Sequence, residues 1–294
     1  MDSLLSSNPL YFSDPKFKNE PTTVLDPPYN FSTLQDYSTY LMDSHLIFNF
    51  QTDISGLNIP EKLNNPFGLQ LPEIARIATK EFQQFIDTES QKWIYDFRTQ
   101  KGKMFGVLVV QKEDSTYGYL GTVSGKVPSN IAGSKFIPSV FDASIDNFFI
   151  NKGMTELTEM GKKIRSIESP SEIATLTKNR KQKSLALQQQ LFESYRFLNL
   201  LGEEKNVFEI FQSSSHSNPP SAAGECTAPK LLHHAFKHRL KPIALAEFWW
   251  GNPPKNKEKE HKVFYPACKN KCRPILEFML NDSELFNQAR AGLE

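Results

Sequence analysis

The sequence predicts a mixed α/β fold of the α+β kind, a small mixed sheet with flanking helices, interrupted by a long helical hairpin. Three observations support this prediction. An apolar pattern at helical spacing follows residue 71, two strand-like apolar runs lie close together in residues 103–124, and a long polar helical stretch fills residues 151–203. The 294 residues are enough for one large domain or two smaller ones.

Three parts are expected along the chain. Residues 1–150 form an N-terminal α/β part, residues 151–203 a helical hairpin, and residues 204–294 a second α/β part that contains the cysteines. We expect residues 71–124 and 204–294 to pack together as one domain. Residues 1–65 are rich in Pro, Asn, Ser and Asp, which favours loops and short elements.

The N-terminal part contains one expected helix and two expected strands. The helix covers residues 71–90, because Ile74, Ala78 and Phe82 recur at helical spacing and Pro72 suits a first turn. Residues 104–110 are apolar and β-branched, which predicts a strand buried on both faces. Residues 117–123 return as its partner after a polar turn.

The expected hairpin consists of a helix at residues 155–168 and a second helix at residues 171–201, separated by Pro170. The second helix ends at Gly202, a residue that favours a helix C-cap. Its first half is strongly basic and includes Arg180, Lys181 and Lys183. Such a run is typical of a solvated helix face, and it also suits an arm that contacts a phosphate backbone.

The C-terminal part is expected to hold a linker at residues 208–220, a helix after Cys226 and a strand at residues 242–250. A charged loop, a short strand at residues 261–265 and a helix after Pro274 follow.

Net charge is distributed unevenly. The whole chain carries +1, but residues 1–100 contain 7 Lys/Arg and 13 Asp/Glu, a net of −6. Residues 223–274 contain 11 Lys/Arg and 4 Asp/Glu, a net of +7. This asymmetry indicates an anionic partner for the C-terminal part.

No secretory signal or membrane span is visible, and three cysteines are an odd number for a disulfide framework. A cytoplasmic, reduced protein without membrane contact is therefore expected.

The three cysteines predict a metal site. Cys226 is expected at the start of one helix, and Cys268 and Cys272 at the start of another. Helix N-termini stabilise thiolates, and three thiolates in a reduced protein are most simply explained by Zn²⁺. The fourth ligand is His261, another histidine or water. The alternative is three free or buried thiols without metal.

Cations and aromatic side chains of the same region, together with the basic helix, predict an RNA-binding surface. Because Trp249 and Trp250 alternate along one strand, we expect one to be buried and the other to lie at a rim. The alternative is that the aromatic residues belong to the core. The predicted RNA-binding residues are Lys230, Lys237, Arg239, Trp249, Trp250, Lys269, Lys271, Arg273, Arg180, Lys181 and Lys183.

The order of these elements resembles the zinc core of the cytidine-deaminase superfamily. There, a cysteine or histidine ligand at a helix start is followed two positions later by a catalytic Glu, and a Pro-Cys-x2-Cys motif opens the next helix. Here position 228 is Ala, and the second motif has an extra Ala267 and one more residue between its cysteines. The resemblance therefore implies a degenerate, non-deaminating zinc domain.

A longer resemblance is to the N-terminal extension of long RluA-type pseudouridine synthases. It covers residues 102–108 (GKMFGVL), 180–192 (RKQKSLALQQQLF), 219–232 (PPSAAGECTAPKLL), 246–251 (AEFWWG) and 264–276 (FYPACKNKCRPIL). It implies an RNA-modifying isomerase whose catalytic domain lies in the same full-length protein, outside these residues. Structured RNA, either rRNA or tRNA, is the implied partner.

Three functions follow from these features. The first is a non-catalytic RNA-binding and positioning region of such a synthase. It has no catalytic Asp motif: the family carries His-Arg-Leu-Asp, and His238-Arg239-Leu240 followed by Lys241 is an accidental match to it. The second is a zinc-dependent hydrolase of the deaminase type, which needs a carboxylate near the metal, such as Glu225 or Glu247. The third is a purely structural zinc module, whose helical hairpin either mediates a homodimer or packs on the missing domain.

Overall fold

The computed structural model describes residues 45–93, 96–99, 101–126, 135–141, 148–214, 218–255 and 258–280. Contacts divide the chain into residues 1–38 and a larger unit of residues 39–294, and all of the described residues belong to the larger unit. Expectations for residues 1–44 lie outside the described residues.

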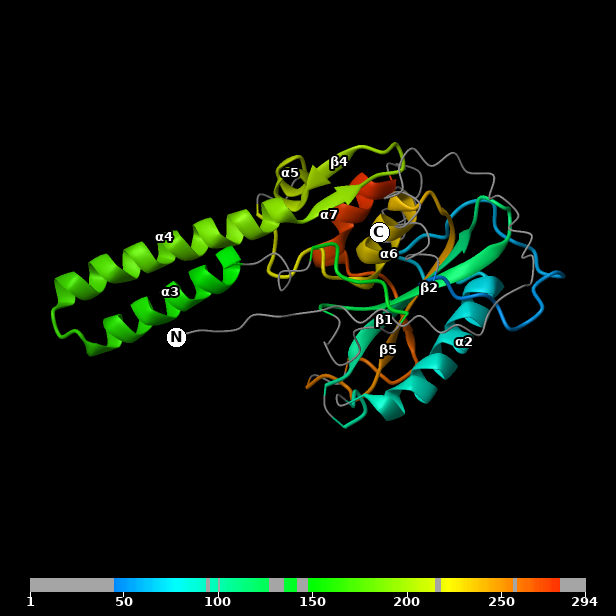
Figure 1. The fold of residues 1–294 in the computed structure, drawn as a ribbon, viewed down its shortest axis with the longest axis horizontal. Coiled ribbons are helices and arrows are strands. Elements are labelled where there is room, and N and C mark those ends of the chain that lie inside the picture. Colours follow the sequence, from blue (N-terminus) through cyan, green and yellow to red (C-terminus); the bar gives the residue numbers. More distant parts are fainter. Residues whose placement is uncertain are drawn as a thin grey trace, which may run out of the picture. The chain divides into compact units, whose positions relative to one another are not determined.

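The larger unit is built on a four-stranded sheet of order β2-β1-β5-β6, formed by β1 (Lys103–Gln111), β2 (Tyr117–Val123), β5 (Lys241–Trp250) and β6 (Phe264–Tyr265) (Figure 1). The mixed α/β class is confirmed. A mixed sheet was expected, but all three pairings are antiparallel. Since β1 and β5 are neighbours, residues 103–124 and the cysteine-containing part share one sheet.

The two faces of the sheet carry different helices. On β1, Phe105, Val107 and Val109 pack with α2 (Glu73–Glu89), as the alternation of side chains along a strand requires. Leu108 and Val110 point to the other face, which is covered by α6 (Thr227–Lys237) and α7 (Lys269–Leu280). Figure 1 shows α2 on one side of the strands, and α6 and α7 on the other. Burial on both faces explains the unbroken apolar run of β1.

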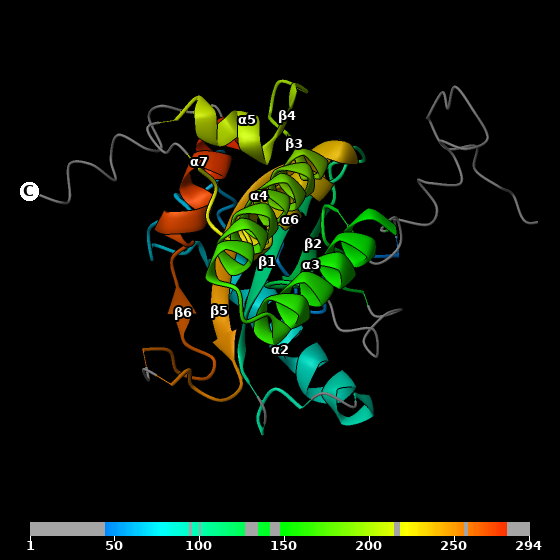
Figure 2. The ribbon, with the colours of Figure 1, turned by 90° about the vertical axis from the view of Figure 1, so that its left-hand side faces the viewer.

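The expected helical hairpin is present as α3 (Phe148–Ser166) and α4 (Pro170–Ser194), with Pro170 at the first turn of α4. Figure 2 looks along this hairpin, with the sheet behind it. In α4 the side chain of Phe192 is buried, and all the others are half-buried or exposed. The hairpin therefore joins the core only near the end of α4.

The second helix of the hairpin was expected to continue to residue 201, and this was wrong. Residues Arg196–Leu198 form β3, which pairs with β4 (Glu204–Asn206) in a separate two-stranded sheet. The reason is the alternation of Tyr195 and Phe197, both buried, with the exposed Arg196 between them. The helical stripe that was expected at these positions is replaced by a strand pattern.

Two other elements differ from the prediction. The expected linker begins with a short helix, α5 (Val207–Gln212), whose capping box links Asn206 and Glu209. Helix α7 begins at Lys269, before Pro274, so this proline lies inside the helix.

A short 3-10 helix (Ser90–Lys92) follows α2. No helix within the described ranges combines the length and the apolar character needed to cross a membrane.

Candidate metal centre

Cys226 is the N-cap residue of α6. The chain reaches it through a tight turn in which Gly224 has a φ of +91°, a conformation that favours glycine. Beyond the turn, α6 packs against the sheet through the fully buried Ala228, Leu231 and Leu232. The position of the Cys226 thiol is therefore fixed by the packing of α6.

Cys268 and Cys272 belong to the entry of α7. The backbone N–H of Cys272 donates to the carbonyl oxygen of Cys268 over 3.2 Å. Because this is one helical turn, the two thiols lie on the same face. Upstream, the N–H of Ala267 donates to the carbonyl oxygen of Pro66 over 2.9 Å, which ties the start of this turn to the N-terminal part.

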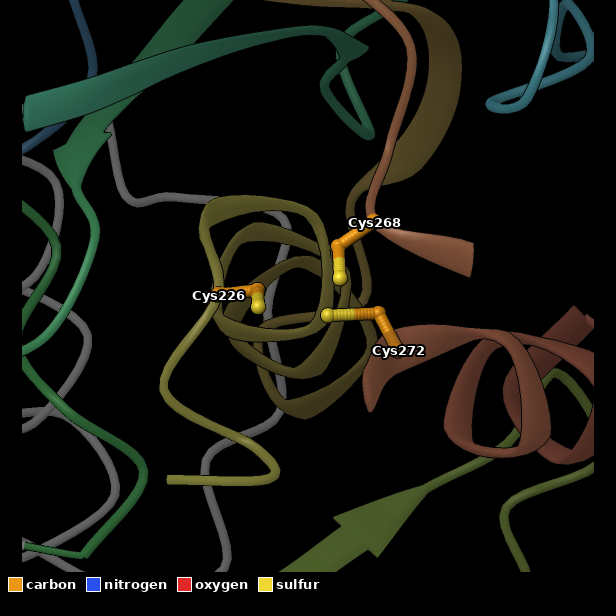
Figure 3. A group of neighbouring side chains, drawn as sticks. All are labelled: Cys226, Cys268 and Cys272. Atoms are coloured by element: carbon orange, nitrogen blue, oxygen red, sulfur yellow. The ribbon is translucent and has the colours of Figure 1, made fainter. Parts of the chain in front are cut away.

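The three cysteine side chains meet between α6 and α7, and Figure 3 shows their sulfur atoms pointing toward one another. The Sγ atoms all lie within 4.8 Å of one another. In a tetrahedral zinc site with Zn–S bonds of about 2.3 Å, sulfurs are about 3.8 Å apart. Small side-chain rotations would therefore let these three thiolates bind one zinc ion. The convergence predicted for Cys226, Cys268 and Cys272 is confirmed.

The thiols influence one another's ionisation. Hydrogen bonds from Cys226 and Cys272, and then backbone N–H groups of Lys271 and Asn270, lower the pKa of Cys268 to about 2. The same bonds, together with burial, raise the pKa of Cys272 well above its ordinary value, and the bond to Cys268 raises that of Cys226. These directions favour a thiolate on Cys268 over thiolates on Cys226 and Cys272, and a metal that binds all three sulfurs would displace the protons that the thiols hold.

His261 was expected as a possible fourth ligand, and the structure does not place it with the sulfurs. Its Nδ1 accepts a hydrogen bond from the N–H of Gly251 over 3.0 Å, and its ring packs on Trp250 with 4.5 Å between centroids. No other His, Cys, Asp or Glu of the described ranges joins the three sulfurs within 4.8 Å. Water remains the simplest fourth ligand.

Glu247 is the carboxylate that the fold brings next to this centre. It lies on β5, is 7% exposed, and accepts hydrogen bonds from the Thr227 hydroxyl and from the N–H of Ala228 over 3.0 Å. Burial raises the pKa of Glu247, while these two donors act in the opposite direction. Its carboxylate caps the first turn of α6, directly beside Cys226.

Glu225 has a different role, although it precedes Cys226 in the chain. Its carboxylate accepts hydrogen bonds from the Tyr195 hydroxyl and from Ser139 Oγ, the latter over 3.2 Å. The carboxylate thus links the turn before α6 to the end of α4 and to the 135–141 segment. These partners hold Glu225 as a structural group.

Three of the predicted RNA-binding residues are buried, which corrects the prediction. The Nζ of Lys230 donates to the carbonyl oxygens of Val123 and Gly125 over 2.7 and 2.9 Å. Trp250 is fully buried, and Trp249 is 7% exposed with its indole N–H donating to Asn252. Neither tryptophan lies at a rim, because β5 is an inner strand covered on both faces. Stacking on RNA by these rings is excluded in this conformation.

The other predicted cations remain at least partly accessible, but they lie in three separate places. Lys237 and Arg239 are exposed at the C-terminal end of α6, about 15 Å from its N-terminus. Lys269 is exposed, and Lys271 and Arg273 are half-buried, at the start of α7 near Cys226. The predicted residues of α4, Arg180, Lys181 and Lys183, form the third group.

Comparison of the chain with family models, with curated proteins and with solved structures gives no match.

Proposed function

We propose that this chain is the non-catalytic RNA-binding and positioning region of a long RluA-type pseudouridine synthase, and that zinc bound by Cys226, Cys268 and Cys272 holds its C-terminal half together. The full-length enzyme converts uridine to pseudouridine in structured RNA, and its catalytic domain acts in cis. The resemblance of five sequence segments supports this family, and three of the five lie in α6, β5 and α7 around the cysteines.

The observation that carries the RNA-binding part is the accessibility of cations near the two ends of α6. Although Lys230 is buried, Lys237, Arg239 and Lys241 remain exposed where α6 ends and β5 begins. Lys269, the first residue of α7, is exposed near the N-terminal end of α6. We define these four residues as the body cations. They lie on β5 and on the two helices that cover one face of the main sheet, or in the turn between α6 and β5, and rigid positive groups of this kind suit RNA phosphates.

Zinc would supply the connection between α6 and α7, two helices that touch on one face of the sheet. Fixing α6 and α7 against each other would hold the elements that carry the body cations, or that lead to them, in one arrangement. His238-Arg239-Leu240 matches the start of the family's His-Arg-Leu-Asp motif only by accident, because Lys241 follows it. A lysine cannot replace a catalytic carboxylate, so a positioning role is favoured over chemistry in this region.

The test is binding of the chain to a labelled tRNA transcript and to an rRNA fragment at increasing salt. We expect the logarithm of the binding constant to fall steeply with the logarithm of the salt concentration, with a slope of about −0.7 to −0.9 for each phosphate contact. Binding without salt dependence, or no binding, would reject the RNA-positioning function.

A zinc-dependent hydrolase is a second candidate, and Glu247 is the specific observation in its favour. The deaminase pattern has its catalytic Glu at position 228, where this chain has Ala. The backbone N–H of Ala228 binds the Glu247 carboxylate instead, so β5 supplies a carboxylate at the place where the helix lacks one. Bound zinc would activate water, and such a carboxylate would move its proton.

This second candidate is tested with wild type and Glu247→Gln, measuring zinc content and ammonia release from cytidine and adenosine. A hydrolase would release ammonia as wild type and lose that activity as Glu247→Gln while keeping its zinc. The RNA-positioning function predicts no ammonia from either protein.

A further inference from the structure

The α3–α4 hairpin is held together by its own side chains. Leu157 of α3 is buried against α4, and its carbonyl oxygen accepts a hydrogen bond from Arg180 Nε over 3.1 Å. Lys183 forms an ion pair with Glu156. Gly153 leaves space for the Leu187 side chain, since a Cβ at position 153 would lie 2.7 Å from it. Arg180 and Lys183, both predicted RNA ligands, are thus engaged within the hairpin.

The outer half of the hairpin, residues 161–183, is strongly basic, and we call it the arm. It contains seven Lys/Arg and two Asp/Glu, a net charge of +5. Lys163 and Arg165 of α3 and Lys178 and Lys181 of α4 are exposed. Among the residues that the structure describes, no ion pair or hydrogen bond engages these four side chains. Four cations on two adjacent helices are therefore available to a partner.

A hollow of about 500 Å³ lies between the two helices of the arm. Its lining includes the cations Arg165, Arg180 and Lys181 and the apolar or small residues Gly161, Ile164 and Leu185. Positive groups thus come from both helices, and aliphatic surface lies between them. A sugar–phosphate backbone matches this surface, because its phosphates pair with cations and its ribose carbons cover aliphatic groups.

We propose that the arm is a second RNA-contacting surface, separate from the body cations, and that it binds the sugar–phosphate backbone without reading bases. This inference rests on the proposed RNA-binding function and assigns part of that binding to the arm. Residues 161–183 contain no Phe, Trp or Tyr, so the arm has no ring on which a base could stack. Its binding is therefore independent of sequence and dependent on salt.

An acidic protein surface is the other class of partner that four free cations could attract. RNA is favoured because the hollow has cations on both walls and only two aliphatic side chains as apolar anchors, Ile164 and Leu185. Protein interfaces of useful affinity usually have aromatic or larger apolar anchors at their centre.

The test compares two variants of the whole chain with equal losses of charge. The arm variant carries Lys163→Gln, Arg165→Gln, Lys178→Gln and Lys181→Gln. The control variant carries Arg76→Gln, Lys80→Gln, Lys92→Gln and Lys112→Gln, which also removes three lysines and one arginine, but from the acidic N-terminal half. Both bind a labelled tRNA transcript and an RNA duplex of unrelated sequence at about 50 to 200 mM salt.

We expect the arm variant to lose at least about tenfold in affinity for both RNAs and the salt slope to fall by about 3. The control variant keeps the wild-type values. A charge-conserving variant, with Lys163→Arg, Lys178→Arg, Lys181→Arg and Arg165→Lys, restores binding and shows that charge rather than folding was lost.

Two results would overturn the inference in different ways. If the arm variant, with wild-type circular dichroism, binds both RNAs as tightly as the control, the arm is not an RNA surface and an acidic protein becomes its partner. If the wild-type chain binds neither RNA, the proposed function itself fails, and the arm fails with it.

Discussion

Lys230 is a cation held inside the protein by two backbone carbonyl groups at the end of β2. Its side chain is 1% exposed, and its Nζ donates to Val123 and Gly125. Replacing it as Lys230→Met keeps the aliphatic volume but leaves both carbonyl oxygens without this donor. We expect the free energy of unfolding in urea to fall by about 1–3 kcal/mol. An unchanged unfolding midpoint would show that water replaces the ammonium group.

The burial of Lys230 also predicts how the stability of the protein depends on pH. Burial lowers the pKa of Lys230 to about 8, below its ordinary value of 10.5. Between these values the unfolded chain binds more protons than the folded one, so the contribution of Lys230 to stability rises with pH across this window. The unfolding free energy of wild type minus that of Lys230→Met should increase by on the order of 2–3 kcal/mol from pH 8 to pH 10.5. A difference that is constant with pH would show that burial does not lower the pKa of Lys230 in the folded protein.

Individual residues show what the sequence could and could not predict about the site. The convergence of the cysteines was predictable, because thiols confined to one segment and placed at two helix starts have a chemical reason to meet. The burial of Lys230, Trp249 and Trp250 was not predictable. Their burial depends on β5 being an inner strand, which is a property of the sheet order and not of the local pattern.

At the scale of elements, Gly106 controls the distance between β1 and α6. A Cβ at this position would lie 2.7 Å from Thr227 Cβ and 3.1 Å from a Leu231 methyl group. Gly106→Ala should therefore push the N-terminus of α6 away from the sheet and move Cys226 away from Cys268. We expect a loss of about 1–3 kcal/mol in stability together with at least about a tenfold loss in zinc affinity.

Gly121→Ala is the matched control for this substitution. Gly121 lies on β2, where a Cβ would meet the ring of Phe82 at 2.3 Å, on the face that packs with α2. Gly121→Ala should lower the free energy of unfolding by as much as Gly106→Ala or more, but it should leave the zinc affinity unchanged. Equal losses of zinc affinity in both variants would mean that the metal centre responds to global stability and not to the position of α6.

Elements with strong local patterns were predictable, and elements that depend on tertiary partners were less so. The helix at α2 and the strands β1, β2 and β5 were expected within a few residues of their bounds, because apolar spacing and β-branched runs define them. The end of α4 was missed because Tyr195 and Phe197 fit a strand only when β4 is present. For α5 the sequence did contain a signal, the capping box from Asn206 to Glu209.

At the scale of the whole molecule, the cysteine centre joins two helices on one face of a sheet whose other face is covered by α2. The strands of that sheet come from residues 103–123 and 241–265, and the hairpin is inserted between them. Metal at the centre would stabilise the α6–α7 side, where the body cations lie. The excess positive charge of the C-terminal part then lies on the α6–α7 side of the sheet, and the arm carries a second group of positive charges.

The measurement that tests the central claim most directly is the metal content of the purified chain combined with X-ray absorption at the zinc edge. We predict one zinc per chain with three sulfur ligands at about 2.3 Å and one lighter ligand. His261→Gln should give the same spectrum, whereas Cys268→Ser should lose zinc and α6–α7 packing. A wild-type chain without metal and with three titratable thiols, or a zinc ion with fewer than three sulfur ligands, would contradict the account.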